Sequence, residues 1–288
     1  MRYLAVFRVA LPAPEEPVHV ERKPNLEISL QPGPLEFSYS VPITKYEPPG
    51  VSMVMGERRV RLPADSYLVI QVVGQSGILR SDMSDAALQV AETTSLLDLR
   101  YSGIVAEKVY EGTVNTPGSA LLMFEGPLTL TAQPERDPKS VAAELAADHA
   151  ALTKLSADRR ERYRLAARWF RRGQDVPNPV DKLLFWWVVL EIYPGEGQGE
   201  KVVRKTRDLL RERLYPDLTA GTVTSKTRLG RIFGLRGDIV HKGQAFVSPD
   251  QQDEFDEHLD RLHAVAVTCL RILAGLAVGD ELDKYVRE

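Results

Sequence analysis

Nine of the chain's nineteen prolines lie in its first fifty residues, and this distribution is the strongest constraint on the fold. Proline has no backbone N–H and a fixed φ, so long helices are excluded from this region. Short runs with β-strand character lie between the prolines, at residues 3–9, 26–30 and 36–41. In the last of these, Phe37 and Tyr39 alternate with polar residues, which is typical of a half-buried strand.

The same pattern continues to about residue 135. Further strands are expected at 51–55, 59–62, 67–73, 104–110, 120–124 and 128–132, with one helix starting near Ser84. We therefore predict that residues 1–135 form a β-rich α+β domain dominated by antiparallel strands.

Beyond residue 135 the composition changes to that of helices. Residues 136–156 are expected to be a linker and connecting helix, followed by a helix from Ala157 to Arg172 that ends at Gly173. The segment 180–193 is apolar almost all round, so it should be the central buried helix. Helices are also expected at 200–214 and 225–233, with a last one starting at Ser248 and Pro249. The predicted fold class is a multi-domain α and β protein, in which 157–288 form an all-α bundle.

The overall composition limits the classes of function. With 43% apolar and 27% charged residues, the 288-residue chain is typical of soluble globular proteins, and no window is long and apolar enough to span a membrane. One cysteine excludes an internal disulfide framework and a cysteine-based zinc site. We expect a cytoplasmic protein with no cofactor and no metal. A net charge of −3 means that any nucleic-acid site must be a local patch.

One motif holds the residue types needed for metal-free RNA cleavage. In Leu-Arg-Gly-Asp-Ile-Val-His-Lys-Gly, residues 235–243, Arg236 precedes His241 by five positions. Histidine titrates near neutral pH and can move protons, while arginine offers a planar fork of donors to a phosphorane. Five residues on a regular helix give about 140° of rotation, so the two side chains would not share a face. Gly237 allows a break, arginine is long enough to reach round, and a two-fold dimer interface would relax the requirement further. Asp238 is expected to cap a short helix or to orient His241.

Basic residues outnumber acids between 201 and 242. Five of these basic residues are predicted to bind RNA phosphates: Lys242, Arg231, Arg228, Lys226 and Lys205. The alternative is a solvated helix face with i,i+4 ion pairs. The last helix is acidic at its start, at Asp250, Asp253, Glu254, Asp256, Glu257 and Asp260.

Three other side chains need an interpretation. Glu191 ends the apolar central helix, and a buried carboxylate requires a partner, so we expect an arginine from the basic region; a catalytic acid is the alternative. His258 and His263 are five apart, which is poor spacing for zinc on a helix, so they are expected at surface and core positions.

The order of these features resembles the HEPN domain family (higher eukaryotes and prokaryotes nucleotide-binding), in particular its Apea-like branch. The resemblance covers roughly residues 155–280. It rests on Leu-Leu-Phe-Trp-Trp-Val-Val-Leu-Glu at 183–191, on a basic helix, and on Leu-Gly-Arg-Ile-Phe-Gly-Leu-Arg-Gly-Asp-Ile-Val-His-Lys-Gly at 229–243. Arg236 and His241 occupy the two positions of the family's Arg-x4-6-His signature.

The resemblance implies a helical bundle of four or five helices that forms a homodimer, with the two motifs meeting across the dimer axis. Many such domains are metal-independent endoribonucleases; some act in phage defence or stress response, or as toxins with a neutralising protein partner. Others bind RNA or a nucleotide without cleaving it. Gly237 stands where many catalytic members have a polar residue, and this departure favours the non-catalytic alternative. A third possibility is a dimeric scaffold in which Arg236 and His241 pair with acids of the last helix.

Overall fold

The computed structural model describes residues 2–47, 50–75, 79–100, 106–114, 136–195, 199–242 and 251–287. Within them the protein is a mixture of helices and antiparallel strands, and the chain divides into two compact units, 1–150 and 151–288. Of the helices in these ranges, none is long and apolar enough to cross a membrane. The strands predicted at 120–124 and 128–132 and the helix start at Ser248 lie outside the described residues.

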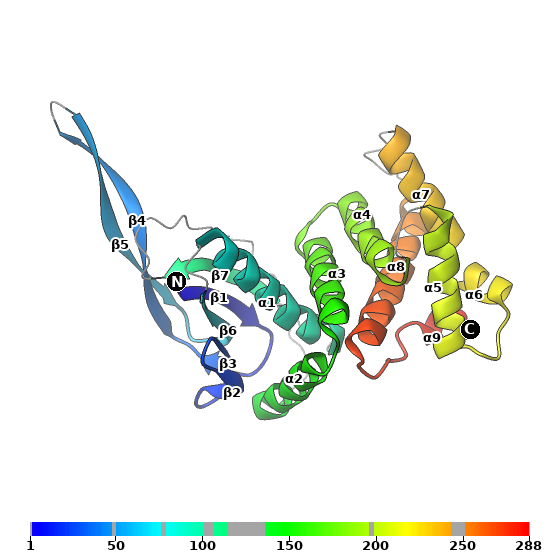
Figure 1. The fold of residues 1–288 in the computed structure, drawn as a ribbon, viewed down its shortest axis with the longest axis horizontal. Coiled ribbons are helices and arrows are strands. Elements are labelled where there is room, and N and C mark those ends of the chain that lie inside the picture. The colour runs from blue at the N-terminus through cyan, green and yellow to red at the C-terminus, as the bar shows by residue number, and fades with distance from the viewer. Residues whose placement is uncertain are drawn as a thin grey trace. The chain divides into compact units, whose positions relative to one another are not determined.

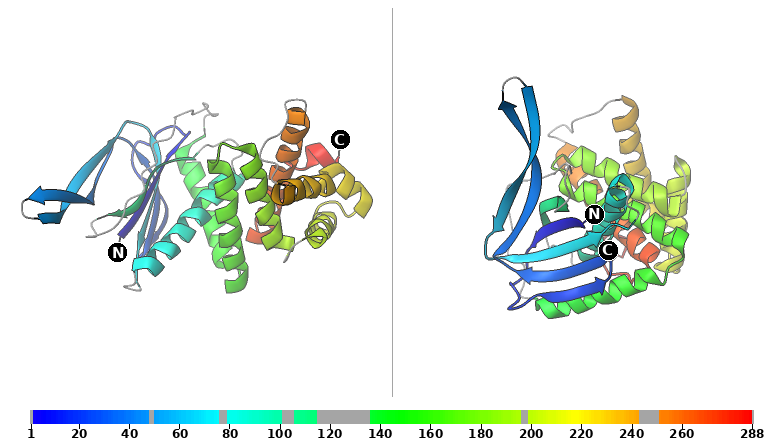
Figure 2. Two further views of the ribbon diagram at one scale, coloured as in Figure 1. Left: turned by 90° about the horizontal axis from the view of Figure 1, so that it is seen from above. Right: turned by 60° about the vertical axis from the view of Figure 1, so that its left-hand side comes forward.

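The first unit contains a five-stranded antiparallel sheet in the order β2-β3-β6-β1-β7 (Figure 1). Its strands are β1 (Arg2–Val9), β2 (Val18–Lys23), β3 (Leu26–Pro32), β6 (Ser66–Val73) and β7 (Ala106–Val114). Helix α1 (Leu79–Arg100) lies against β1 and β7, and its position across the sheet can be followed in Figure 2. Helix α2 (Pro138–Thr153) is tied to the same unit, because Asp148 pairs with Arg100 and His149 lies 3.5 Å from Glu21.

Strands β4 (Leu35–Glu47) and β5 (Gly50–Leu62) form a separate two-stranded ribbon that extends away from the sheet (Figure 1). Its base is fixed by Tyr39 and Leu62, which pack with Tyr67 and Tyr110 of the sheet. The sequence predicted a strand ending before Pro42, but β4 continues through it, with Pro42 opposite Met55. Each strand of a two-stranded ribbon has a free edge, so a missing proline donor there breaks no ladder hydrogen bond.

The described residues of the second unit form helices α3 to α9 and a short π-helical turn. They are α3 (Ala157–Asp175), α4 (Pro179–Leu190), η1 (Glu191–Gly195), α5 (Glu200–Arg213), α6 (Ala220–Thr227), α7 (Leu229–Lys242), α8 (Gln252–Ala274) and α9 (Asp283–Val286). As predicted, the apolar α4 is buried, and it packs against α3 and α8. Ser156, Asn178 and Thr219 cap the starts of α3, α4 and α6 through side-chain hydrogen bonds.

The sequence predicted that α3 would end at Gly173, but the helix continues to Asp175. The residue lies against α4, and a Cβ added there would be 2.4 Å from Nε1 of Trp186. The same indole nitrogen donates to the backbone oxygen of Phe170 at 3.3 Å. Glycine is thus required by the close approach of a tryptophan side chain rather than by a helix end.

Candidate functional site on helix α7

Helix α7 begins in the core of the second unit and ends in solvent. Its first residues follow Arg228, which has a left-handed backbone (φ 52°) and turns the chain from α6 into α7. Leu229 and Ile232 are completely buried. From residue 235 to the end of the helix no side chain is fully buried, and Val240 is 48% exposed. The predicted motif therefore lies on the exposed half of a helix anchored at its other end.

Arg236 is held in place by the end of α4. Its Nη2 donates to Oε1 of Glu191 at 3.1 Å, and Nε1 of Trp187 donates to the same oxygen at 3.0 Å. The two side chains of the ion pair are 23% and 17% exposed. This confirms the prediction that Glu191 pairs with an arginine of the basic region.

His241 lies in the exposed last turn of α7, apart from this cluster. The break that Gly237 would allow does not occur, because α7 is one continuous helix from Leu229 to Lys242. Residues 236 and 241 are therefore about 140° apart around the helix axis. Within the described ranges, His241 has no hydrogen bond or ion pair. A single chain thus fixes the guanidinium but does not bring the imidazole to it.

Asp238 has neither of its two expected roles. It lies inside α7 rather than at a helix start, and its Oδ1 is 2.7 Å from Nζ of Lys242, one turn later. Both side chains are largely exposed, at 41% and 73%. This is an ordinary i,i+4 pair, and such pairs are the alternative that the sequence left open for the basic residues.

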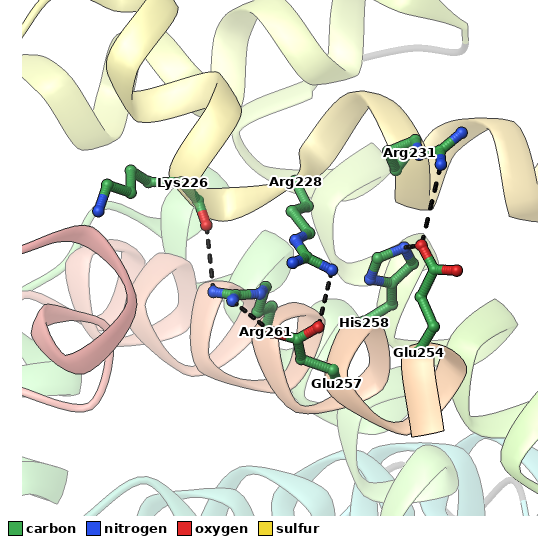
Figure 3. Close-up of polar contacts among 7 residues, drawn as sticks. All are labelled: Lys226, Arg228, Arg231, Glu254, Glu257, His258 and Arg261. Carbon is green, nitrogen blue, oxygen red and sulfur yellow. Dashed lines mark hydrogen bonds and ion pairs between the residues drawn. The ribbon is translucent and has the colours of Figure 1, made fainter. Parts of the chain in front are cut away.

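The cations at the start of α7 face acids of α8, and Figure 3 shows these contacts. Arg228 Nη1 lies 2.7 Å from Glu257 Oε2, and Arg231 Nη2 lies 3.9 Å from Glu254 Oε1. Arg261 of α8 donates to Glu257 Oε1 at 2.7 Å and to the backbone oxygen of Lys226 at 3.2 Å. Hydrogen bonding to Arg261 lowers the pKa of Glu257. The remaining predicted phosphate ligand, Lys205, lies on α5.

A cavity of about 450 Å³ lies between α7 and α8. Gly230 and Gly234 contribute bare backbone to its wall, and a Cβ at either position would meet nothing within 4 Å. Asp238 and Glu254 also line it, as does His258. The interpretation of His258 and His263 as surface and core positions missed His258 as a cavity residue, although the i,i+4 spacing of Gly230 and Gly234 on a basic helix was a signal of an open helix face.

His258 is buried, with 3% of its side chain exposed. Burial lowers the pKa of its imidazole, and the positive charge of Arg228 lowers that pKa further. His263, five residues later, is different: Gln174 is 2.9 Å from its Nε2, and Phe170 and Trp186 pack against its ring. The first histidine lines a cavity and the second belongs to the core.

The described part of the chain contains no cluster of three or more histidine, cysteine or acidic side chains that could hold a metal ion. Cys269 is completely buried, which raises the pKa of its thiol. Comparison of the sequence with models of protein families, with characterised proteins and with solved structures finds no match.

Proposed function

We propose that this protein is a metal-independent endoribonuclease of the HEPN type that acts as a homodimer through its helical unit. The observation that supports it best is the different placement of Arg236 and His241 on α7. Arg236 is fixed by Glu191 and Trp187, whereas His241 is exposed on another side of the same helix. A second copy packed against the exposed half of α7 would bring its own imidazole to the fixed guanidinium.

In this mechanism the 2′-hydroxyl of RNA attacks the neighbouring phosphorus. The His241 of one copy takes the proton of that hydroxyl, and its imidazolium then gives a proton to O5′ as the P–O5′ bond breaks. Arg236 stabilises the charge that builds on the non-bridging oxygens. The products are a 2′,3′-cyclic phosphate and a 5′-hydroxyl. Lys242 and other exposed cations of the helical unit would draw in the phosphate backbone, as expected from the sequence.

The test is incubation of the full chain with single-stranded RNA in EDTA. Cleavage is expected, and His241→Ala should lower its rate by about 10²- to 10⁴-fold, the usual contribution of a general acid or base. His19→Ala is a matched control, because His19 is a partly exposed histidine of the first unit. Absence of EDTA-resistant cleavage by the unmodified chain would refute the proposal.

Mixing two inactive variants tests whether the site is shared between subunits. A site built from two copies predicts that His241→Ala and Arg236→Ala, mixed and allowed to exchange subunits, recover part of the cleavage rate. A site within one chain predicts no recovery, because every chain in the mixture lacks one of the two groups.

The second candidate function is a non-catalytic RNA-binding module. It is favoured by the ion pair between Arg236 and Glu191, which already satisfies part of the guanidinium. Under this alternative the chain binds single-stranded RNA in a salt-dependent manner and leaves it intact. Filter binding with a labelled oligonucleotide, followed by gel analysis of the bound RNA, separates the two candidates.

A further inference from the structure

A second site lies at the other end of α7, where α6 turns into it. The cavity there, about 590 Å³, is lined by Thr224, Ser225, Arg228, Gly230, Arg231, Glu254 and His258, and we call it the elbow site. It shares Gly230, Arg231, Glu254 and His258 with the 450 Å³ cavity between α7 and α8. One end of the combined space is therefore polar. The other has the apolar side chains of Val180, Leu235, Ile239 and Phe255, with Asp238 and Gln251 beside them.

The elbow site has an excess of positive charge. Arg228 and Arg231 line it against one carboxylate, that of Glu254, and Glu257 and Arg261 lie beside it. Glu257 pairs with Arg228 and Arg261 at 2.7 Å, whereas among the described residues the ion pair of Arg231 is with Glu254 at 3.9 Å, beyond hydrogen-bond distance. The Arg231 side chain is 78% exposed, so its donors are accessible from solvent. One cation at this elbow is therefore available to an anion.

His258 provides an independent indication of a ligand. Its Nδ1 is buried and has no hydrogen-bond partner among the residues that the structure describes. Its Nε2 lies 3.6 Å from Oε1 of Glu254. A buried polar atom without a partner costs stability, and such atoms often mark a bound ligand, ion or water. His258 lines both cavities, so a group bound there would lie beside this residue.

The first turn of α7 adds backbone donors. Ile232 is the first residue of this helix whose amide bonds back to Arg228, at 3.0 Å, and the amides before it have no partner inside the helix. Gly230 lines the elbow site without a side chain to cover them. The start of a helix is electropositive and is a common place for phosphate groups.

We propose that the elbow site binds a small phosphate monoester with an apolar body. Its phosphate is held by Arg231, His258 and the first-turn amides of α7, and its body occupies the cavity lined by Leu235, Ile239 and Phe255. Ten residues of α7 separate Arg231 from His241, about 15 Å along the helix. The elbow site is therefore distinct from the proposed RNA-cleaving motif, and the two can succeed or fail independently.

Replacing Glu254 tests whether the ligand is an anion or a cation. A phosphate would compete with this carboxylate for Arg231 and His258, so Glu254→Gln should tighten binding. A cationic ligand would need the carboxylate, and the same substitution would weaken its binding. Charge-assisted hydrogen bonds are strong enough for about a tenfold change in affinity in either direction.

The direct test is calorimetric titration of the full chain with inorganic phosphate and with phenyl phosphate at low salt. Phenyl phosphate should bind more tightly, because its ring enters the apolar cavity. Arg231→Gln should weaken both by about tenfold, through loss of a charge-assisted contact. Arg213→Gln is the matched control, since Arg213 is an exposed arginine on α5. No saturable binding, or an equal effect of the two substitutions, overturns the proposal.

The pH dependence of sulfate binding tests the part played by His258. Sulfate keeps its charge throughout the range in which histidine titrates, so only the protein changes. The charged groups that face the ring are Arg228 and Arg231 on the α6–α7 side and Glu254 and Glu257 on α8, with Asp238 across the cavity. Sulfate should bind more tightly as the pH falls, and His258→Gln should remove that dependence. A dependence that survives the substitution contradicts the assignment of His258.

A final comparison tests whether the phosphate monoester belongs to a small molecule or to the 5′ end of an RNA. A 5′-phosphorylated RNA oligonucleotide also carries a phosphate monoester. It should bind the elbow site more weakly than phenyl phosphate, because the cavity lies between two packed helices. Tighter binding of the oligonucleotide that is lost in Arg231→Gln but kept in His241→Ala would place an RNA end at the elbow and overturn the small-ligand assignment.

Discussion

At the start of α7, Leu229 and Ile232 are buried and the neighbouring Arg228 is paired with Glu257, whereas at its end Val240 and His241 are exposed. The two ends belong to one continuous helix, but the first half holds more large apolar residues and the second half more basic ones. The two ends also differ in the support that they receive from other helices. The buried end has its partners from α6 and α8 within one chain, so a ligand site there needs no second copy. The exposed end has one fixed group, Arg236, and needs a partner to complete a site.

The largest difference between the two ends is expected in stability. Ile232→Ala should lower the free energy of unfolding by about 2–5 kcal/mol, because it leaves a cavity in a closed core. Val240→Ala removes a side chain that is 48% exposed and should change it by less than about 0.5 kcal/mol. Urea unfolding followed by circular dichroism measures both. Similar losses for the two variants would mean that the end of α7 is buried in solution, as a tight dimer through that end would require.

The partly buried ion pair of Arg236 gives the next largest effect. Glu191→Gln keeps an acceptor for Trp187 but leaves the guanidinium without its charge partner, and we expect a loss of about 1–3 kcal/mol. The control is Asp238→Asn, which removes the exposed partner of Lys242 and should cost less than about 0.5 kcal/mol. Equal losses in urea unfolding would show that Glu191 does not fix Arg236.

The sequence predicted correctly those features that depend on neighbouring residues, and those for which a buried group needs one kind of partner. The alternation around Phe37 and Tyr39 predicted a strand, and the apolar run at 183–190 predicted a buried helix. The rule that a buried carboxylate needs a partner predicted an arginine beside Glu191. Which arginine it would be depends on how α7 packs against α4, and that packing has no local signal.

The errors have the same cause. Pro42 lies inside β4 because the ribbon has free edges, which the residues near Pro42 do not reveal. Asp238 was expected to cap a short helix or to orient His241, whereas α7 continues past it and the i,i+4 spacing pairs Asp238 with Lys242. His258 is buried at the start of α8, beside the turn that Arg228 makes into α7, and nothing in the residues near His258 indicates this.

The pH dependence of stability provides the last test of the two ends. Burial, with a further contribution from Arg228, lowers the pKa of His258 below the 6.5 of an unfolded histidine. The unfolded chain therefore binds a proton more readily than the folded one, and stability should fall as the pH drops below about 6.5. His263, whose pKa is lowered to about 4 by burial, contributes in the same direction.

The contribution of His258 is the difference between the unmodified chain and His258→Gln in the stability lost on acidification. Urea unfolding of the unmodified chain and of His258→Gln, at about pH 7 and about pH 5, should show a smaller loss of stability on acidification for the variant, because the remaining loss comes from His263 and the carboxylates. His241→Gln, at the exposed end of the same helix, should leave the loss unchanged. If His258→Gln behaves like His241→Gln, the start of α7 does not bury a histidine, and the elbow site loses the unpaired ring atom on which it was inferred.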